Sequence, residues 1–196
     1  METLQMREEP LGPGLAISTG KLGMWVFLVS EIMFFTGLIG SYLVLRLGSG
    51  AWPQPGTILN TGLLGINTLV LLTSSLTMAL GLQAIRENRP QALVWYLRLT
   101  ALLGAAFVAI KVADYVHMWR RGFTIASSLF GSCYYLLTGF HGLHVLSGVI
   151  LLLVLAHGAG RGAFSAEHHT RIECSGLYWH FIDVVWVILF AILCLV

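Results

Sequence analysis

The sequence predicts an all-α membrane protein, a bundle of five transmembrane helices with a cytoplasmic N-terminus and a C-terminus on the periplasmic or outer side. The chain is 57% hydrophobic and only 10% charged, whereas soluble domains carry about 25% charged residues. It also contains five segments that reach the roughly 20 apolar residues needed to cross a bilayer as a helix. These segments do not alternate as barrel strands do, so helices are expected.

The predicted organisation is a short tail followed by one membrane domain. Residues 1–20 are expected to be a cytoplasmic tail rather than a signal peptide, because they lack a basic stretch followed by an apolar core and a cleavage site. Residues 21–196 are expected to form the five-helix domain. Its spans are predicted at about 22–45, 58–85, 92–119, 128–156 and 175–196.

Basic residues in the loops predict the orientation. With the N-terminus inside, the inner side would hold Arg7, Lys21, Arg86, Arg89, Arg161 and Arg171, and the outer side Arg46, Arg120 and Arg121. An excess of Lys and Arg marks the cytoplasmic side of a membrane protein, so this arrangement is favoured. The net charge of +2 is too small to indicate a nucleic-acid partner.

Small residues in two spans predict close helix packing. Gly37, Gly40 and Ser41 lie in the first span, and Gly139, Gly142, Ser147 and Gly148 lie in the fourth. Such residues allow helix backbones to approach each other in a membrane. A compact bundle is therefore expected.

Charged side chains within the spans are the first candidates for function, because they are costly in hydrocarbon. Glu31 lies near the middle of the first span. It could be a proton-related or lipid-facing carboxyl, or a protonated Glu that hydrogen bonds to a neighbouring helix. Lys111 and Asp114 are three residues apart on one helical face, and this spacing predicts a structural ion pair.

Two histidines in the fourth span, His141 and His144, are also three residues apart. They cannot both bind one haem iron axially, because the axial ligands lie on opposite faces of the ring. Zinc or copper would need three or four converging ligands. We expect these histidines to form hydrogen bonds between helices, and we expect no metal site in this chain.

The last span carries a row of polar residues. Glu173, His180 and Asp183 lie on roughly one helical face, which is polar from the inner surface toward the middle of the membrane. Such a face indicates either a contact with another subunit or a polar lining.

Several motifs resemble one family, subunit III of the haem-copper terminal oxidases of the cytochrome c oxidase type. The resemblance runs from about Gly20 to the C-terminus. The motifs are YWHFIDVVW at 178–186, TGFHGLHV at 138–145, SEIMFFTG at 30–37, LNT at 59–61, and GFTI at 122–125 with GS at 131–132.

This resemblance implies a non-catalytic subunit of a proton-pumping oxidase that reduces oxygen to water. The bundle would pack against subunit I, which holds the haems and copper, together with subunit II and other respiratory subunits. Subunit III binds no redox metal in this family, and it is associated with stability of subunit I during turnover, proton uptake, bound phospholipid and oxygen access.

The resemblance also carries over to single positions. Glu31 matches the family's buried carboxyl, and Asp114 matches an acidic position that is usually Glu. Structural or interface roles are implied for His141, His144, Glu173, His180 and Asp183, and none of them is expected to be catalytic.

The chain departs from the longer family members, which have seven spans with a lipid-filled cleft between the first two and the rest. This chain corresponds to the last five spans, as in bacterial oxidases, which points to a bacterial plasma membrane. Three alternatives stay open: an accessory subunit of a quinol oxidase or nitric oxide reductase, a haem b anchor using His141 or His144, and a proton-coupled transporter using Glu31 and Asp114.

Overall fold

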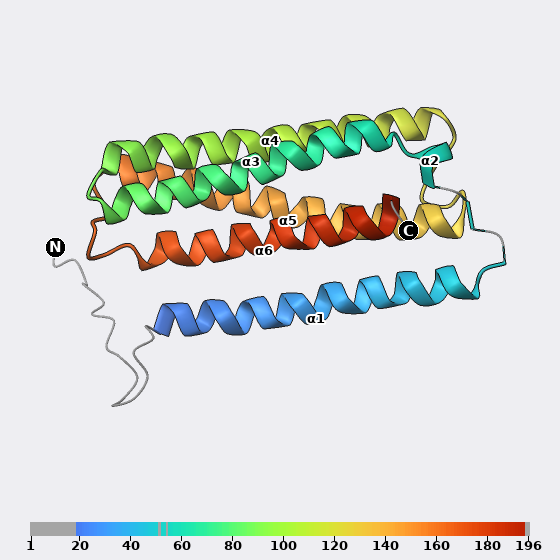
Figure 1. The fold of residues 1–196 in the computed structure, drawn as a ribbon, viewed down its shortest axis with the longest axis horizontal. Helices are drawn as coiled ribbons and strands as arrows, with labels where there is room; N and C mark the ends of the chain where they lie inside the picture. The colour runs from blue at the N-terminus through green and yellow to red at the C-terminus, as the bar shows by residue number, and fades with distance from the viewer. Residues whose placement is uncertain (1–18, 51, 54, 195–196) are drawn as a thin grey trace.

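The computed structural model describes residues 19–50, 52–53 and 55–194, and this part of the chain is built from helices and short connections (Figure 1). The helices are α1 (Thr19–Gly48), α2 (Pro55–Ile58), α3 (Thr61–Arg86), α4 (Pro90–Arg120), α5 (Leu129–Gly160) and α6 (Thr170–Cys194). All except α2 are long and apolar enough to cross a membrane. The predicted all-α fold with five long apolar helices is therefore confirmed.

The helix ends differ from the predicted spans for local reasons. The second span was expected from residue 58, but α3 begins at Thr61, because the Asn60 side chain accepts a hydrogen bond from the Leu63 amide at 3.0 Å. Asn is among the preferred residues for this N-cap. The last helix begins at Thr170, five residues before the predicted start. Most of the expected tail, residues 1–18, lies outside the described residues.

The five long helices run roughly alongside one another, each antiparallel to the next in sequence (Figure 1). Helices α3 and α4 form a hairpin on one side of the bundle, and α1 lies on the other side. Helix α6 packs against α1, α3 and α5. One end of the bundle, called here the Lys21 end, collects the start of α1, the end of α3 and the start of α6; Cys194 lies at the opposite end.

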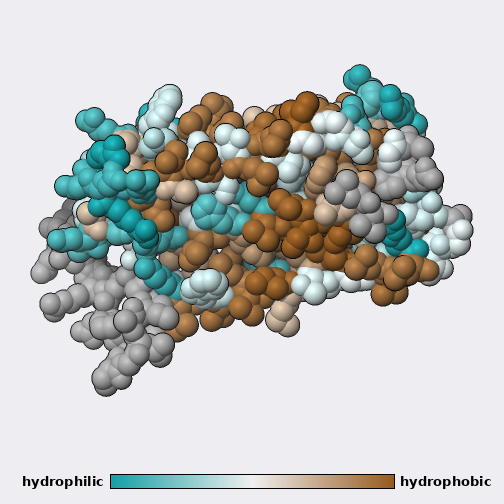
Figure 2. Space-filling model, viewed as in Figure 1, coloured by the Kyte–Doolittle hydropathy of each residue, from teal (hydrophilic) through white to brown (hydrophobic). Residues whose placement is uncertain are grey.

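The surface is banded as expected for a membrane protein. Figure 2 shows hydrophilic residues gathered at the two ends of the bundle and mainly hydrophobic residues between them. Among the described basic residues, Lys21, Arg86, Arg89, Arg161 and Arg171 belong to the Lys21 end, whereas Arg46, Arg120 and Arg121 belong to the other. This distribution favours a cytoplasmic Lys21 end, and the orientation remains a prediction.

Helix α1 is the least buried of the long helices. Its buried residues are Leu28, Phe35 and Tyr42, which are spaced by seven and form one narrow stripe. Large apolar residues on its other faces are exposed, among them Met33 at 71% and Leu47 at 86%. Most of the α1 surface is thus available to lipid or to another subunit.

Trp179 of α6 lies at the centre of the bundle and touches the three helices around it. Its indole nitrogen donates a hydrogen bond to the Ser74 hydroxyl of α3 at 3.0 Å. Its ring lies against Gly104 of α4 and Gly148 of α5, where an added Cβ would come within 2.5 and 2.8 Å of ring atoms. No side chain fits at either glycine without moving the tryptophan.

The expectation of close packing at small residues is therefore met at Gly148 but is wrong at four other glycines within this chain. A Cβ added at Gly37, Gly40, Gly139 or Gly142 would meet no atom within 4 Å among the described residues. These glycines face away from the neighbouring helices of the bundle. The spacing of small residues does not reveal which of them meets a bulky ring.

We expect Gly148→Ala to destabilise the bundle by about 1–3 kcal/mol, the usual range for overpacking a core, because its Cβ would overlap Trp179. Gly139→Ala in the same helix is the matched control, and it should be neutral or slightly stabilising because alanine favours helix. Thermal denaturation of the purified protein measures the difference. Equal melting temperatures for the two variants would contradict the proposed packing.

Candidate functional site

Glu31 and His144 meet near the middle of the membrane-spanning region. The Glu31 carboxylate oxygen Oε2 lies 2.9 Å from His144 Nε2, which joins α1 to α5. Both side chains are mostly buried, with 18% and 19% of their surface exposed. The intramembrane carboxyl is thus paired with an imidazole on another helix.

The geometry limits where protons can lie in this pair. His144 Nδ1 lies 2.7 Å from the Phe140 carbonyl oxygen, and a carbonyl can only accept a hydrogen bond, so Nδ1 carries a proton. Nε2 then either accepts a hydrogen bond from a neutral Glu31 carboxyl or donates one to an ionised Glu31. In both cases the pair is neutral overall and shares one proton along the bond.

Aromatic rings flank the pair, and the Tyr178 hydroxyl donates to the His144 carbonyl oxygen at 3.3 Å. The ring of Phe35 lies edge-on to His144, with 5.1 Å between centroids, and Phe34 packs against Phe140 at 5.2 Å. An apolar surrounding strengthens the electrostatic interaction within the pair. The Glu31–His144 pair is therefore a mostly buried carboxyl–imidazole contact between α1 and α5.

Lys111 and Asp114 form a second buried cluster with Tyr134 of α5. The Lys111 ammonium lies 3.4 Å from Asp114 Oδ2 and donates to the Tyr134 hydroxyl at 2.5 Å. The Tyr134 hydroxyl in turn donates to Asp114 at 3.2 Å. The ammonium also lies 4.7 Å from the Tyr134 ring centroid and 5.5 Å from that of Trp186. Hydrogen bonds and cation–π contacts thus stabilise the buried charge.

His141 is fully buried between α5 and α6. Its Nε2 donates to the Ile182 carbonyl oxygen at 3.2 Å. The ring packs edge-on to Phe107 and against Trp186, with centroid distances of 5.7 and 4.9 Å. This geometry links two helices.

The polar residues of α6 lie in different surroundings. Glu173 and His180 line a cavity at the Lys21 end, and His180 Nδ1 lies 2.5 Å from the Ser75 hydroxyl of α3. Asp183 is buried, and neither of its carboxyl oxygens has a hydrogen-bond partner among the described residues. Ser75 also lies near Asp183, but its hydroxyl bonds to His180.

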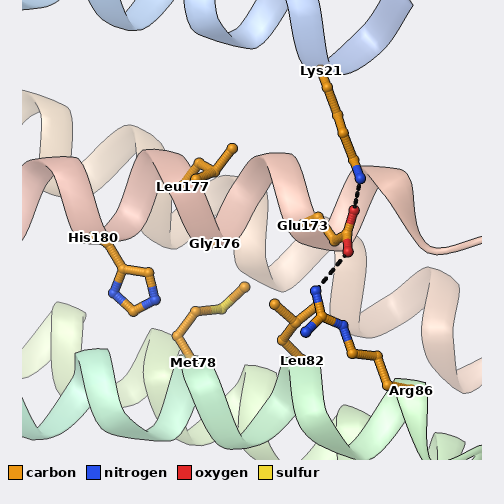
Figure 3. A pocket seen from close by; sticks show the side chains of 8 residues that line it. All are labelled: Lys21, Met78, Leu82, Arg86, Glu173, Gly176, Leu177 and His180. Carbon is orange, nitrogen blue, oxygen red and sulfur yellow. Dashed lines mark hydrogen bonds and ion pairs between the residues drawn. The ribbon is translucent and has the colours of Figure 1, made fainter. Parts of the chain in front are cut away.

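The cavity has a volume of about 240 Å³ and lies between α1, α3 and α6 (Figure 3). Glu173 bridges Lys21 of α1 at 2.5 Å and Arg86 of α3 at 2.8 Å. Met78, Leu82, Gly176 and Leu177 supply the apolar part of its wall. The row of α6 polar residues thus begins at an ion-paired cavity and ends at a buried carboxyl.

Sequence reasoning did not identify several partners of these residues. Tyr134, which bonds to both Lys111 and Asp114, resembles any aromatic residue in an apolar helix. Ser75, the partner of His180, is one of two adjacent serines in a span without charged residues. Such a pair of hydroxyl groups was a signal in the sequence for a polar contact at this point. Among the described residues, no three His, Cys, Asp or Glu side chains converge as metal ligands would.

Comparison with known proteins identifies the family. The family model of cytochrome c oxidase subunit III matches residues 14–195, which is nearly the whole chain. The chain belongs to this family. It is 43% identical over 170 residues to cytochrome c oxidase subunit 3 of Synechocystis sp., covering 86% of this chain and 72% of that protein. It is 38% identical over 173 residues to cytochrome c oxidase subunit 3 of Thermostichus vulcanus, covering 88% and 85%.

Family membership also establishes the class of protein. The chain is a multi-pass membrane protein of a haem-copper oxidase family, as its resemblance to subunit III indicated. A further relative, the probable cytochrome c oxidase subunit 3 of Nocardia farcinica, is 39% identical over 171 residues, covering 87% of this chain and 84% of that protein. The roles of individual residues remain predictions.

We expect Glu31→Gln to leave the bundle intact, because the Gln amide can donate to His144 Nε2 in place of a protonated Glu. Glu31→Leu should destabilise it by about 1–3 kcal/mol, because it leaves a mostly buried nitrogen without a partner. Thermal denaturation of the purified variants measures both effects. Equal destabilisation by the two changes would contradict the proton-sharing bond.

The contacts among Lys111, Asp114 and Tyr134 predict that substitutions of Lys111 and Asp114 have non-additive effects on stability. Lys111→Met should destabilise the protein by about 3–5 kcal/mol, because it leaves a buried carboxylate without its cation. Lys111→Met combined with Asp114→Asn should be less destabilising than the single change, because no charge is left uncompensated. A double-mutant cycle by thermal denaturation measures this difference, and additive effects would contradict the pairing.

Proposed function

We propose that this chain is the non-catalytic subunit III of a proton-pumping haem-copper oxidase in a bacterial plasma membrane. Its family membership and its bacterial relatives support this role. The proposed partners are subunit I, which would hold the haems and copper, together with subunit II and other respiratory subunits. The chain itself would carry no redox centre, and bound phospholipid would occupy part of its surface.

The exposed face of α1 supports a role in assembly. Only one stripe of α1 is buried against the rest of the bundle, and large apolar side chains cover its other faces. Within a bilayer an apolar helix face of this kind can contact either lipid or another subunit. Subunit I would pack against this face.

The Glu31–His144 pair is the observation that supports a role in proton uptake. Its geometry allows Glu31 and His144 to share a hydrogen bond between two helices near the middle of their spans. Such a pair can accept or release a proton locally when a neighbouring subunit changes charge. We propose that it supports proton uptake by subunit I, next to a surface that gives lipid and oxygen access.

Gentle purification through a tag on this chain tests the assignment. Partner chains should co-purify with haem and copper, and the chain alone should show no haem spectrum. An oxidase that lacks this chain should begin turnover normally and lose activity faster during turnover. A bis-histidine haem spectrum from the isolated chain, lost on His141→Ala, would contradict the assignment and favour a haem b anchor.

A further inference from the structure

Asp183 is a buried carboxyl that the contacts described so far leave unused. Only 4% of this residue is exposed, and neither carboxyl oxygen has a hydrogen-bond partner among the residues that the structure describes. A carboxylate buried without a partner is so costly that the group takes up a proton and becomes neutral. The neutral carboxyl still needs an acceptor for its O–H. Because the bundle itself covers Asp183, a side chain of another subunit has no access to it.

The Ser75 hydroxyl of α3 lies close to Asp183 and has bonding capacity to spare. Its oxygen lies 2.5 Å from His180 Nδ1, and a hydroxyl can donate one hydrogen bond and accept two. When Ser75 donates to Nδ1, both of its acceptor positions remain, and the neutral imidazole carries its own proton on Nε2. A water beside both groups would accept from the Asp183 carboxyl and donate to the Ser75 oxygen. Buried waters bind at polar groups that otherwise lack partners.

His180 connects this point to the cavity at the Lys21 end. It lines the cavity of about 240 Å³, and in Figure 3 its ring extends from α6 into the space between α6 and α3. One water requires only about 10–15 Å³ of such space. Lys21 and Arg86 line the polar part of the cavity, and their side chains are 39% and 57% exposed. Solvent therefore has a polar route from the Lys21 end as far as the His180 ring.

This row of polar groups ends at Asp183. Along α6 no titratable side chain follows it before Cys194, and α3 has none before its last residue. The two histidines of α5 are engaged elsewhere, because His141 bonds to the α6 backbone and His144 pairs with Glu31 of α1. A proton that reaches Asp183 along this row therefore meets no further titratable carrier on α3 or α6.

We propose that Asp183 is a protonated carboxyl that binds a water between α3 and α6 and exchanges its proton with solvent at the Lys21 end, through Ser75, His180 and the cavity. The carboxyl passes its proton to the bound water as that water passes one of its own to Ser75. Ser75 passes its proton to His180 Nδ1, and His180 releases its Nε2 proton to water in the cavity.

These steps leave Asp183 as a carboxylate and His180 as its other neutral tautomer, and only O–H and N–H bonds form and break. The proton returns by the same steps in reverse. Because the bound water can turn in between, the carboxyl receives a different proton from the one it lost. The carboxyl is thus filled and emptied from one side of the membrane.

Infrared spectroscopy of the complex purified through this chain tests the site. A protonated carboxyl gives a C=O stretching band, which Asp183→Asn should remove and which should move to lower frequency after transfer to heavy water. Ser75→Ala and His180→Phe should keep the band but slow its shift by about tenfold or more, a change of about 1.4 kcal/mol in the exchange barrier. Exchange would then have to wait for local opening of the helices.

Thr73→Val is the matched control for Ser75→Ala. Thr73 lies on an exposed part of α3, and its hydroxyl donates to the Leu69 carbonyl oxygen of its own helix, so its loss should leave the rate of the shift unchanged. A band of equal size in the wild type and Asp183→Asn would overturn the protonated carboxyl. A shift that is equally fast in Thr73→Val, Ser75→Ala and His180→Phe would overturn the route.

Gly176→Leu tests where the water enters. A Cβ at Gly176 would lie 3.4 Å from the Met78 methyl carbon, so the leucine narrows the cavity and keeps Asp183, Ser75 and His180. It should slow the shift of the band. An unchanged rate would place the entry elsewhere and overturn the link to the Lys21 end. Because the band is assigned through a substitution in this chain, the result does not depend on which partners co-purify.

Discussion

The position of α6 against α3, α4 and α5 depends on the packing of Trp179. This ring occupies the space left by two glycines on different helices and donates its N–H to Ser74 of the third. In a membrane, helices gain little from hydrophobic burial against each other, and close packing at small residues holds them together. One large ring between three backbones therefore sets the spacing of α3, α4 and α5 around α6 at this level.

Polar contacts across the bundle follow from that spacing and are mostly made by α6. Trp186 donates to Thr68 of α3, seven residues after Trp179 makes the same kind of bond to Ser74. His141 reaches the α6 backbone from α5. Each such bond is worth about 0.6–2 kcal/mol in a membrane, and together they set the rotation of each helix. Asp183 is the exception, because its buried oxygens are left without hydrogen-bond partners among the residues that the structure describes.

Sequence reasoning predicted the features that depend on composition and local spacing. Five apolar stretches are enough to give five helices, and the i to i+3 spacing of Lys111 and Asp114 places them within reach of each other. It could not predict pairs that depend on helix rotation, such as Glu31 with His144, which are 113 residues apart. The same rotation turns Gly148 toward Trp179, whereas a Cβ at Gly139 would meet no atom within 4 Å in the described part of the chain, although both glycines lie in one helix.

Polar contacts join helix α1 to the rest of the bundle at three depths. Lys21 binds Glu173 at one end, Glu31 binds His144 near the middle, and Arg46 contacts the Tyr42 hydroxyl and the Ile192 carbonyl oxygen at the other. Between them only a narrow apolar stripe is buried. Ionic contacts change with protonation and with competing ions, whereas apolar packing does not. The placement of α1 therefore depends on charged contacts as well as on packing, and α1 is also the least buried of the long helices.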